Sequence, residues 1–434
     1  MNMADAPIDD ATRAAIVAAV AANFDDQVEF LADFVRIPSL RFREGPAQDY
    51  MAAALRARGM EVDDWTIELK DLEPLPGFGP IEGDFSRART VVGTHRPTVN
   101  TGRSLILQGH LDVVPEGPVE MWTTAPFDPV VKDGWMHGRG AGDMKSGTVA
   151  ALFALDALRS AGFEPAATIH FQSVIEEEST GLGALSTLQR GYRADCALIP
   201  EPTDHTMTRA QVGVIWFKLR VRGRPVHVSH AGEGANAITA AYELIRALQG
   251  LEIEWNARAA EHPQFSDVVH PLNFNAGKIA GGDWASSVPA WCDVDCRIGI
   301  LPGWDIAEAQ AEILACVSGA ARSHTFLSNN PPEVMWNGFL AEGWVLEGSD
   351  EPEAVFGEAY ADVFGPGEIP RDRKMTALTD TRFYGLYYGI PALCFGPKSQ
   401  GIHGFDERVD LASVKACTET FALFIARWCG LNRI

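Results

Sequence analysis

The sequence predicts an α/β protein in which a mostly parallel sheet with helices on both faces is interrupted by a smaller α+β unit. In the first and last parts of the chain, apolar strand-like segments alternate with helical segments, a pattern typical of parallel sheets covered on both faces. From about residue 210 the strand-like segments instead alternate apolar and polar residues, which indicates a sheet with one exposed face. The chain has 434 residues, 46% of them hydrophobic, enough for two cores.

The first part of the main domain is expected over residues 1–209 and opens with a helix over 10–36. This helix should end before Pro38, because a proline disfavours helical geometry in the residue that precedes it. The elements expected next are a buried strand over 105–114, a long buried helix over 144–162, and strands over 167–175 and 197–203. Gly162 is the expected end of the long helix, since glycine commonly follows the last helical residue.

The smaller unit is expected over residues 210–328, and the second part of the main domain over 329–434. The segments expected in the smaller unit are half-buried strands over 214–223 and 291–300 and a helix over 236–250. Residues 327–338, LSNNPPEVMWNG, have the composition of a return linker. The main domain then ends with a core strand over 391–397 and a closing helix over 411–430, which Gly430 should terminate.

Charge and cysteine content restrict the partners and the compartment. A formal net charge of −22 disfavours attraction to nucleic acid or to an anionic membrane surface. No apolar run of about 18 residues exists, so no membrane span is expected. Asp5, Asp9 and Asp10 precede the apolar run at 14–22, which therefore indicates a helix and not a signal peptide. The seven cysteines are scattered and odd in number, which is typical of reduced thiols in a cytoplasmic protein.

The stretch HGRGAGDMKSG, residues 137–147, is rich in glycine but does not fit a phosphate-binding loop. The Walker pattern requires glycine directly before Lys145-Ser146, and Met144 stands there. The dinucleotide-binding pattern requires a third glycine where Asp143 stands. What remains is a carboxylate on a glycine-hinged turn before a helix. Taken alone, such an aspartate is also the usual cap of a helix.

Other polar side chains follow apolar segments that should be core strands. His110 and Asp112 lie two residues apart at a strand end, and therefore on one face. A carboxylate so placed can accept the second N–H of a metal-bound imidazole. The run Glu176–Glu178 places three carboxylates together, and these repel one another unless a cation lies nearby. Glu201 and His403 each follow another expected strand.

Each of these residues alone has an ordinary structural explanation, as a polar strand end or a solvated face. Their joint placement is more informative, because ligands gather at the carboxyl ends of the strands in parallel sheets. Two histidines and several carboxylates converging there suit one or two divalent ions such as zinc.

The same segments resemble the metallopeptidase family of acetylornithine deacetylase, succinyl-diaminopimelate desuccinylase, aminoacylase and carboxypeptidase G. The motifs that carry the resemblance are QGHLDVVP, the W-x(4)-PF-x-P loop at Trp122, GRGAGDMKSG, IEEESTGLGAL, IPEPT, VHVSHAGEGANAI and FGP…IHGFDERV. They occur in the family's order, from the IPSL segment near residue 37 to the C-terminal helix. Seven ordered motifs are a highly specific signal.

The resemblance implies two zinc ions, for which cobalt or manganese can substitute. Asp143 would bridge both ions, with His110 and Glu201 on one and Glu178 and His403 on the other. The smaller unit would be a lid and dimerisation domain, which predicts a homodimer.

The resemblance also implies roles beside the ions. Asp112 would orient the imidazole of His110. Glu177 would be the general base, taking a proton from a water that the two cations acidify and returning it to the leaving amine. His227 would donate a hydrogen bond to the developing oxyanion, often across the dimer. Glu176 stands where the family usually has aspartate, which leaves both following glutamates in place.

A free carboxylate on the substrate would need a cation that binds with two N–H groups, and arginine suits this best. By resemblance Arg297 matches the family's arginine for that carboxylate, although a strand-surface salt bridge is the alternative. Arg382 is a weaker candidate, and Asn236 would line the same cleft. The family often has Asn-Val-Val-Pro where this chain has the segment 286–289, Ser-Ser-Val-Pro.

The activity implied is that of a cytoplasmic zinc amidohydrolase that removes the acyl group of an N-acyl amino acid, with a domain that closes over the substrate. A metallo-carboxypeptidase or dipeptidase of the same family is the nearest alternative, since the chemistry is the same and the pocket contacts differ. A catalytically silent relative that only binds ligands is disfavoured, because Glu177 and all the expected ligand positions are present.

Overall fold

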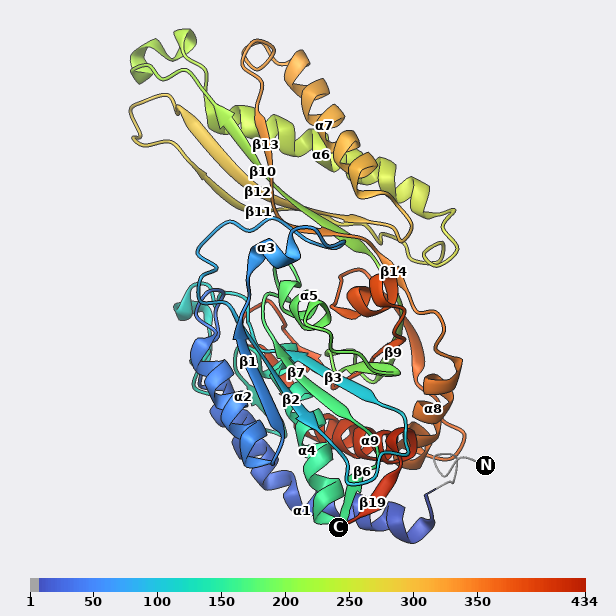
Figure 1. Cartoon of the computed structure of the whole chain (residues 1–434). Coiled ribbons are helices and arrows are strands. Elements are labelled where there is room, and N and C mark those ends of the chain that lie inside the picture. Colours follow the sequence, from blue (N-terminus) through green and yellow to red (C-terminus); the bar gives the residue numbers. More distant parts are fainter. Residues whose placement is uncertain (1–7) are drawn as a thin grey trace.

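The computed structural model describes residues 8–434; Asp5, named above, lies outside this part. A larger unit built on a six-stranded sheet lies below a smaller unit built on a four-stranded sheet (Figure 1). Each unit has its own cluster of buried apolar side chains. The α/β class with an interrupting α+β unit is therefore confirmed.

The larger sheet has the strand order β1-β2-β7-β3-β8-β16. The strands are β1 (Glu61–Thr66), β2 (Arg89–His95), β7 (Ile169–Val174), β3 (Leu105–His110), β8 (Cys196–Ile199) and β16 (Ala392–Cys394). Strands β7, β3, β8 and β16 are parallel, whereas β2 is antiparallel to both β1 and β7. The parallel part was predicted, whereas the antiparallel strand β2 between β1 and β7 was not.

Helices cover both faces of this sheet. The helices of the larger unit are α1 (Asp10–Val35), α2 (Gly45–Ala57), α3 (Leu69–Leu72), α4 (Ser146–Ser160), α5 (Leu182–Gln189), α8 (Asp350–Phe364) and α9 (Leu411–Cys429). Gly109 of β3 faces α4, where an added Cβ would lie 2.1 Å from Thr148 Oγ1. On the opposite face, Thr187 of α5 donates a hydrogen bond to Gln172 of β7 at 3.0 Å. Helices α1, α4 and α9 pack against one another, as the apolar runs of their sequences require.

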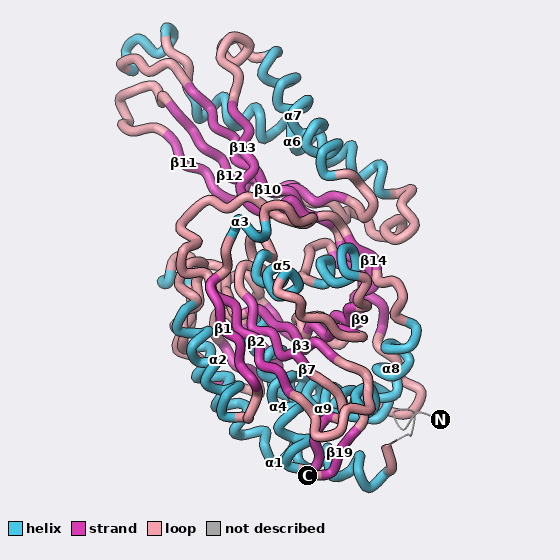
Figure 2. The backbone as a smooth tube through the Cα atoms, viewed as in Figure 1, coloured by secondary structure: helices cyan, strands magenta, loops and turns pink. Residues whose placement is uncertain are grey.

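The smaller unit is an antiparallel sheet with two helices on one face (Figure 2). Its elements are β10 (Gly213–Arg222), α6 (Ala237–Ala259), β11 (Phe274–Gly281), β12 (Trp291–Ile300), α7 (Ile306–Ser323) and β13 (Glu333–Ala341), with the strand order β11-β12-β10-β13. Along β12 the buried side chains of Cys292, Val294 and Cys296 alternate with more exposed ones. This alternation was predicted from the sequence.

Two sequence expectations for the smaller unit are wrong. The linker expected over residues 327–338 is in its second half strand β13, which pairs with β10 and so extends the small sheet. The helix expected over residues 236–250 continues to Ala259. Glycine costs only about 1 kcal/mol inside a helix, and buried Leu248, Leu251 and Trp255 continue the apolar face through Gly250.

Three smaller sheets join distant segments. They consist of β14 (Trp344–Val345), β9 (Thr206–Gln211) and β15 (Arg371–Met375); of β17 (Ser399–Gln400), β18 (Arg408–Asp410), β5 (Trp135–His137) and β4 (Val130–Lys132); and of β19 (Leu431–Arg433) and β6 (Phe163–Pro165). The pairing of β18 with β5 places the FDERV motif beside the glycine-rich turn. Among the described residues, no helix has both the length and the apolar character needed to cross a membrane.

Candidate metal centre

The predicted ligand residues gather at the carboxyl ends of the parallel strands. His110 is the last residue of β3, and the glutamate run 176–178 follows the end of β7. Glu201 follows β8, and His403 lies in the loop between β17 and β18. Asp143 comes from the turn over residues 141–145 that leads into α4. The sheet therefore brings together residues that lie far apart in the sequence, as the strand-end argument predicted.

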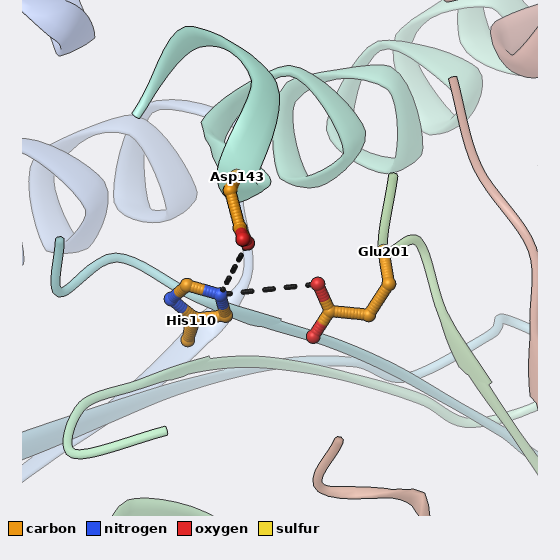
Figure 3. A group of neighbouring side chains, drawn as sticks. All are labelled: His110, Asp143 and Glu201. Atoms are coloured by element: carbon orange, nitrogen blue, oxygen red, sulfur yellow. Dashed lines mark hydrogen bonds and ion pairs between the residues drawn. The ribbon is translucent and has the colours of Figure 1, made fainter. Parts of the chain in front are cut away.

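The two oxygens of Asp143 face two different histidines. His110 Nε2 lies 3.2 Å from Asp143 Oδ1 and 3.9 Å from Glu201 Oε2 (Figure 3). On the other side, His403 Nε2 lies 3.5 Å from Asp143 Oδ2 and 3.1 Å from Glu178 Oε2. In each of these two groups, the ligand atoms all lie within 4.8 Å of one another. The arrangement suits two neighbouring cations that share one carboxylate.

Asp112 holds the loop that carries the glutamates. The Asp112 carboxylate accepts the backbone N–H groups of Glu177 and Glu178, at 3.4 and 3.2 Å. The nearest acceptor for His110 Nδ1 is the backbone carbonyl of Asp112, at 2.9 Å, and the carboxylate is farther away at 3.6 Å. When Nδ1–H donates to this carbonyl, Nε2 is free to bind a cation.

The electrostatics of the site also favour cations. Burial raises the pKa of Glu177 and of Glu201 well above the usual range, although His110 opposes this effect. Burial raises the pKa of the neighbouring Asp380 to about 7. The Glu178 carboxylate raises the pKa of His403 to about 11. So many buried acids repel one another, and divalent cations would neutralise them.

The donor set fits divalent metal ions. Carboxylate oxygens and imidazole nitrogens are the ligands that zinc and similar ions prefer when no thiolate is present. Within residues 8–434, buried Glu201 Oε1 has no hydrogen-bond partner. A buried polar atom of this kind normally has one, so it has a free position for a metal ion. The site thus fits the metal chemistry that the sequence predicts.

Glu177 lies beside both ligand groups. Its side chain is almost fully buried, and its Oε2 lies 3.7 Å from His110 Nε2. It belongs to neither the group of His110, Asp143 and Glu201 nor that of Asp143, Glu178 and His403, although it forms a third close group with His110 and Glu178. This position suits a base that acts on a molecule held between the ions.

The sequence reasoning missed the partner of Glu176. Arg41 donates from Nε and Nη2 to the two Glu176 oxygens, at 2.5 and 2.8 Å, and Thr180 Oγ1 donates to Oε2 at 2.9 Å. Glu176 has a positive φ of 66°, and its carbonyl accepts the N–H groups of Ser179, Thr180 and Gly181. The pair therefore fixes the turn that begins directly before Glu177.

Asp380 was also missed, although it stands in the LTDTRFYG segment that contains Arg382. It is buried and accepts a hydrogen bond from Gln108 at 2.9 Å. Arg382 is fully buried as well, donates to the carbonyl of Thr180 at 3.0 Å, and lies over the ring of Phe383. The burial of both side chains becomes visible only in the structure, so no local sequence pattern pointed to Asp380.

Arg297 lines a cavity of about 550 Å³ between the two units. Its Nη1 donates to the carbonyl of Asn273 at 3.2 Å, and among the described residues no carboxylate lies within ion-pair distance of it. The neighbouring Asp293 instead pairs with Arg220, at 2.8 Å. Arg41 lines the same cavity, so the cavity adjoins the turn that precedes Glu177.

His227 and Asn236 lie elsewhere in the smaller unit. His227 is exposed, and its Nδ1 lies 2.8 Å from Ser229 Oγ. Asn236 caps α6, where its side chain accepts the N–H groups of Ile238 and Thr239 at 2.9 and 3.1 Å. In the described part of the chain, neither side chain has a hydrogen bond or an ion pair to the metal cluster.

A protein-family model and several known enzymes are similar to this chain in sequence. Residues 106–427 match the model of Peptidase family M20/M25/M40. The chain is 29% identical to the N-formyl-4-amino-5-aminomethyl-2-methylpyrimidine deformylase of Bacillus subtilis, over 91% of this chain and 92% of that protein. It is 25% identical to the succinyl-diaminopimelate desuccinylase of Stenotrophomonas maltophilia, over 92% of this chain and 98% of that protein.

Solved structures share the fold. A di-peptidase of Saccharomyces cerevisiae has a TM-score of 0.80 at 15% identity and covers 96% of this chain and 99% of its own. Human carnosine dipeptidase 1 has a TM-score of 0.77 at 16% identity, with coverage of 96% and 99%. At such low identity these structures support the fold alone.

Proposed function

Since this chain belongs to peptidase family M20/M25/M40, a family of amide-bond hydrolases, we propose that it is a two-zinc deacylase of N-acyl amino acids. The single observation that carries the proposal is the orientation of Asp143. One of its oxygens faces His110 and the other faces His403, and each histidine has a further carboxylate beside it. A purely structural ion-pair network does not require this symmetry about one carboxylate.

Asp143 would bridge the two ions, His110 and Glu201 would complete one, and Glu178 and His403 the other. When bound, two such cations lower the pKa of a shared water towards neutrality and polarise the scissile carbonyl. Glu177 takes the water proton on a carboxylate oxygen and later returns it to the nitrogen of the leaving amine. Asp112 keeps Glu177 and Glu178 in place by accepting both of their backbone N–H groups.

The oxyanion donor would come from a second copy of the chain. His227 is exposed, and no contact joins it to the metal cluster of its own chain among residues 8–434. In a two-fold symmetric dimer, a loop of one protomer can complete the site of the other. We therefore propose that His227 acts in the site of the partner protomer. The native protein would then be a homodimer.

The substrate would carry a free carboxylate. Arg297 lines the cavity without an acidic partner of its own in the described residues, and a half-buried guanidinium without a counter-ion favours an anionic ligand. The relatives named above include a deformylase and a desuccinylase. Their names support removal of a small acyl group from an amine.

A substrate panel tests this proposal. Protein stripped of metal is supplied with zinc or cobalt and assayed with N-formyl, N-acetyl and N-succinyl derivatives of one amino acid, and with dipeptides of the same amino acid. We expect turnover of the acyl derivatives, which should be lost when the substrate carboxylate is converted to an amide. Turnover of dipeptides alone would favour the peptidase alternative, and bound metal without turnover of any amide would indicate a ligand-binding relative.

A further inference from the structure

A buried carboxylate outside the predicted ligand set lies against the turn that carries Asp143. Glu407 has no exposed surface and stands directly before β18. Its Oε1 accepts the backbone N–H groups of Gly140, Gly142 and Asp143, at 3.0, 2.9 and 3.0 Å. One oxygen therefore holds three backbone amides of the turn, including that of Asp143 itself.

Arg139 completes the arrangement from the other side. It donates from Nη1 to Glu407 Oε2 and from Nη2 to the carbonyl of Gly404, the latter at 2.9 Å. Both side chains of this ion pair are buried. Because Gly404 directly follows His403, the guanidinium ties the loop of one ligand to the turn of another. The pairing of β18 with β5 keeps the two segments in register.

Two glycines of the turn have close neighbours that leave no room for a side chain. A Cβ on Gly142 would lie 3.2 Å from Glu407 Oε1 and 2.9 Å from the Ser399 Cβ. A Cβ on Gly140 would lie 2.6 Å from Val113 Cγ1, and its φ of +81° also favours glycine. Gly142 therefore lets the turn approach the Glu407 carboxylate and Ser399, and Gly140 lets it pass close to Val113. The motif GRGAGD therefore shapes a backbone nest for a carboxylate of the chain itself.

We propose that Glu407 is the positioning residue of the metal centre, which holds Asp143 at the point where its carboxylate can serve two cations. Glu407 contacts neither the cations nor the substrate, and acts through the backbone of the turn and, with Arg139, through the loop of His403. The inference rests on the proposed two-ion site. It adds to that site a residue that links the bridging ligand to a ligand of the second ion.

Replacement of Glu407 should change metal affinity differently from replacement of a metal ligand. Removing an outer partner of a metal ligand typically lowers metal affinity about 10–100-fold. Because Asp143 would serve both ions, Glu407→Ala should weaken the binding of both. His403→Ala, in contrast, removes a ligand from one ion and should weaken mainly one of the two binding steps.

The experiment measures zinc affinity of the full-length apo-protein by chelator competition, and the visible spectrum of the cobalt form, without using activity. Gln27→Ala is the matched control, because Gln27 is equally buried and its hydrogen bond to Thr418, at 2.8 Å, joins α1 to α9. We expect Glu407→Ala to lose affinity for both ions, about 10–100-fold, with an altered cobalt spectrum. Gln27→Ala should lose thermal stability and keep wild-type zinc affinity.

Glu407→Gln should recover only part of the affinity, since its amide oxygen can still accept the three N–H groups but its NH2 group cannot accept from Arg139. If Glu407→Ala does not fold, Glu407→Asp replaces it, because its carboxylate is one methylene too short to reach the turn and Arg139 together. Wild-type affinity in the folded alanine or aspartate variant would overturn the inference and leave the proposed function standing. An equal loss of affinity in Gln27→Ala would overturn it too. A wild-type protein that binds no divalent metal would overturn both.

Discussion

Among single residues, Arg41 gives Glu176, the first glutamate of the run 176–178, a structural role. Glu176 reaches Arg41 with both oxygens and so joins the loop at residue 41 to the turn before Glu177. The sequence predicted the glutamate run but not its partner, because the two residues are 135 positions apart. No local pattern encodes such a contact. The same reason explains why Glu407 and Asp380 were missed. His110, Glu178, Glu201 and His403 could be singled out because each follows an apolar segment, and Asp143 because it stands in a glycine-rich turn before a helix.

Replacement of Arg41 should lower the free energy of unfolding. Arg41→Ala leaves the buried Glu176 carboxylate without its cation, and breaking such a pair from one side costs about 3 kcal/mol in the free energy of unfolding. Arg36→Ala is the matched control, because the Arg36–Asp33 pair is about half exposed on both sides and should contribute less than about 1 kcal/mol. Urea unfolding of both variants measures the difference. Equal stability of the two variants would show that the Arg41 pair does not hold the turn.

Among helices and strands, the elements predicted most accurately from the sequence are the buried ones, whose residues are mostly apolar. The long helix α4 and the closing helix α9 have continuous apolar runs, and Gly430, with a φ of +68°, ends α9 as expected. Strands β1 and β2 were not predicted. Asp63 and Asp64 interrupt the apolar pattern of β1, whereas β2 is buried along most of its length. The edge strand β1 needs only one buried face, so its sequence signal is weaker.

Asn236 was expected to line the substrate cleft, but capping of helix α6 gives it a structural role. Its side chain caps α6, so Asn236→Ala should lower the free energy of unfolding by about 1 kcal/mol. Asn236→Asp retains the capping oxygen and should be nearly neutral. Steady-state kinetics and thermal unfolding of both variants separate the two roles. A rise in KM without a loss of stability would show that Asn236 contacts the substrate instead.

At the level of the whole molecule, the assembly of the site across two chains can be tested by mixing. Glu177→Ala and His227→Ala should each be nearly inactive, the latter with kcat reduced about 100-fold or more. If His227 acts on the partner's site, a mixed dimer contains one complete site. An equal mixture of the two variants, unfolded and refolded together, should then recover about one quarter of wild-type activity in a two-fold dimer. Mixed dimers without recovered activity would place His227 outside the partner's site.

Removal of the metal should make the stability of the whole protein depend on pH. Burial raises the pKa of Asp380 from 3.8 to about 7, and Glu178 raises that of His403 from 6.5 to about 11. Both groups hold their proton more tightly when folded. Their stabilising contribution is complete below the ordinary pKa and is lost as the pH rises through the raised one.

The urea midpoint of EDTA-treated protein should therefore fall between about pH 5 and about pH 9. Zinc should raise the midpoint most at the higher pH, where the carboxylates are ionised and His403 competes less well for its proton. A midpoint independent of pH, with or without zinc, would contradict the electrostatic account of the cluster.

The central claim is that Asp143 bridges two ions while its neighbour Glu177 acts as the base, and the adjacent glutamates test it most directly. Metal content and kcat are measured for Glu177→Ala and Glu178→Ala. Glu177→Ala should bind close to two ions per chain and lose kcat at least about 100-fold, without recovery on added zinc. Glu178→Ala should lose one ion and recover in part at high zinc, because mass action refills a weakened site. A metal-deficient Glu177→Ala variant would exchange the two roles, and full metal content in both variants would contradict the two-ion centre.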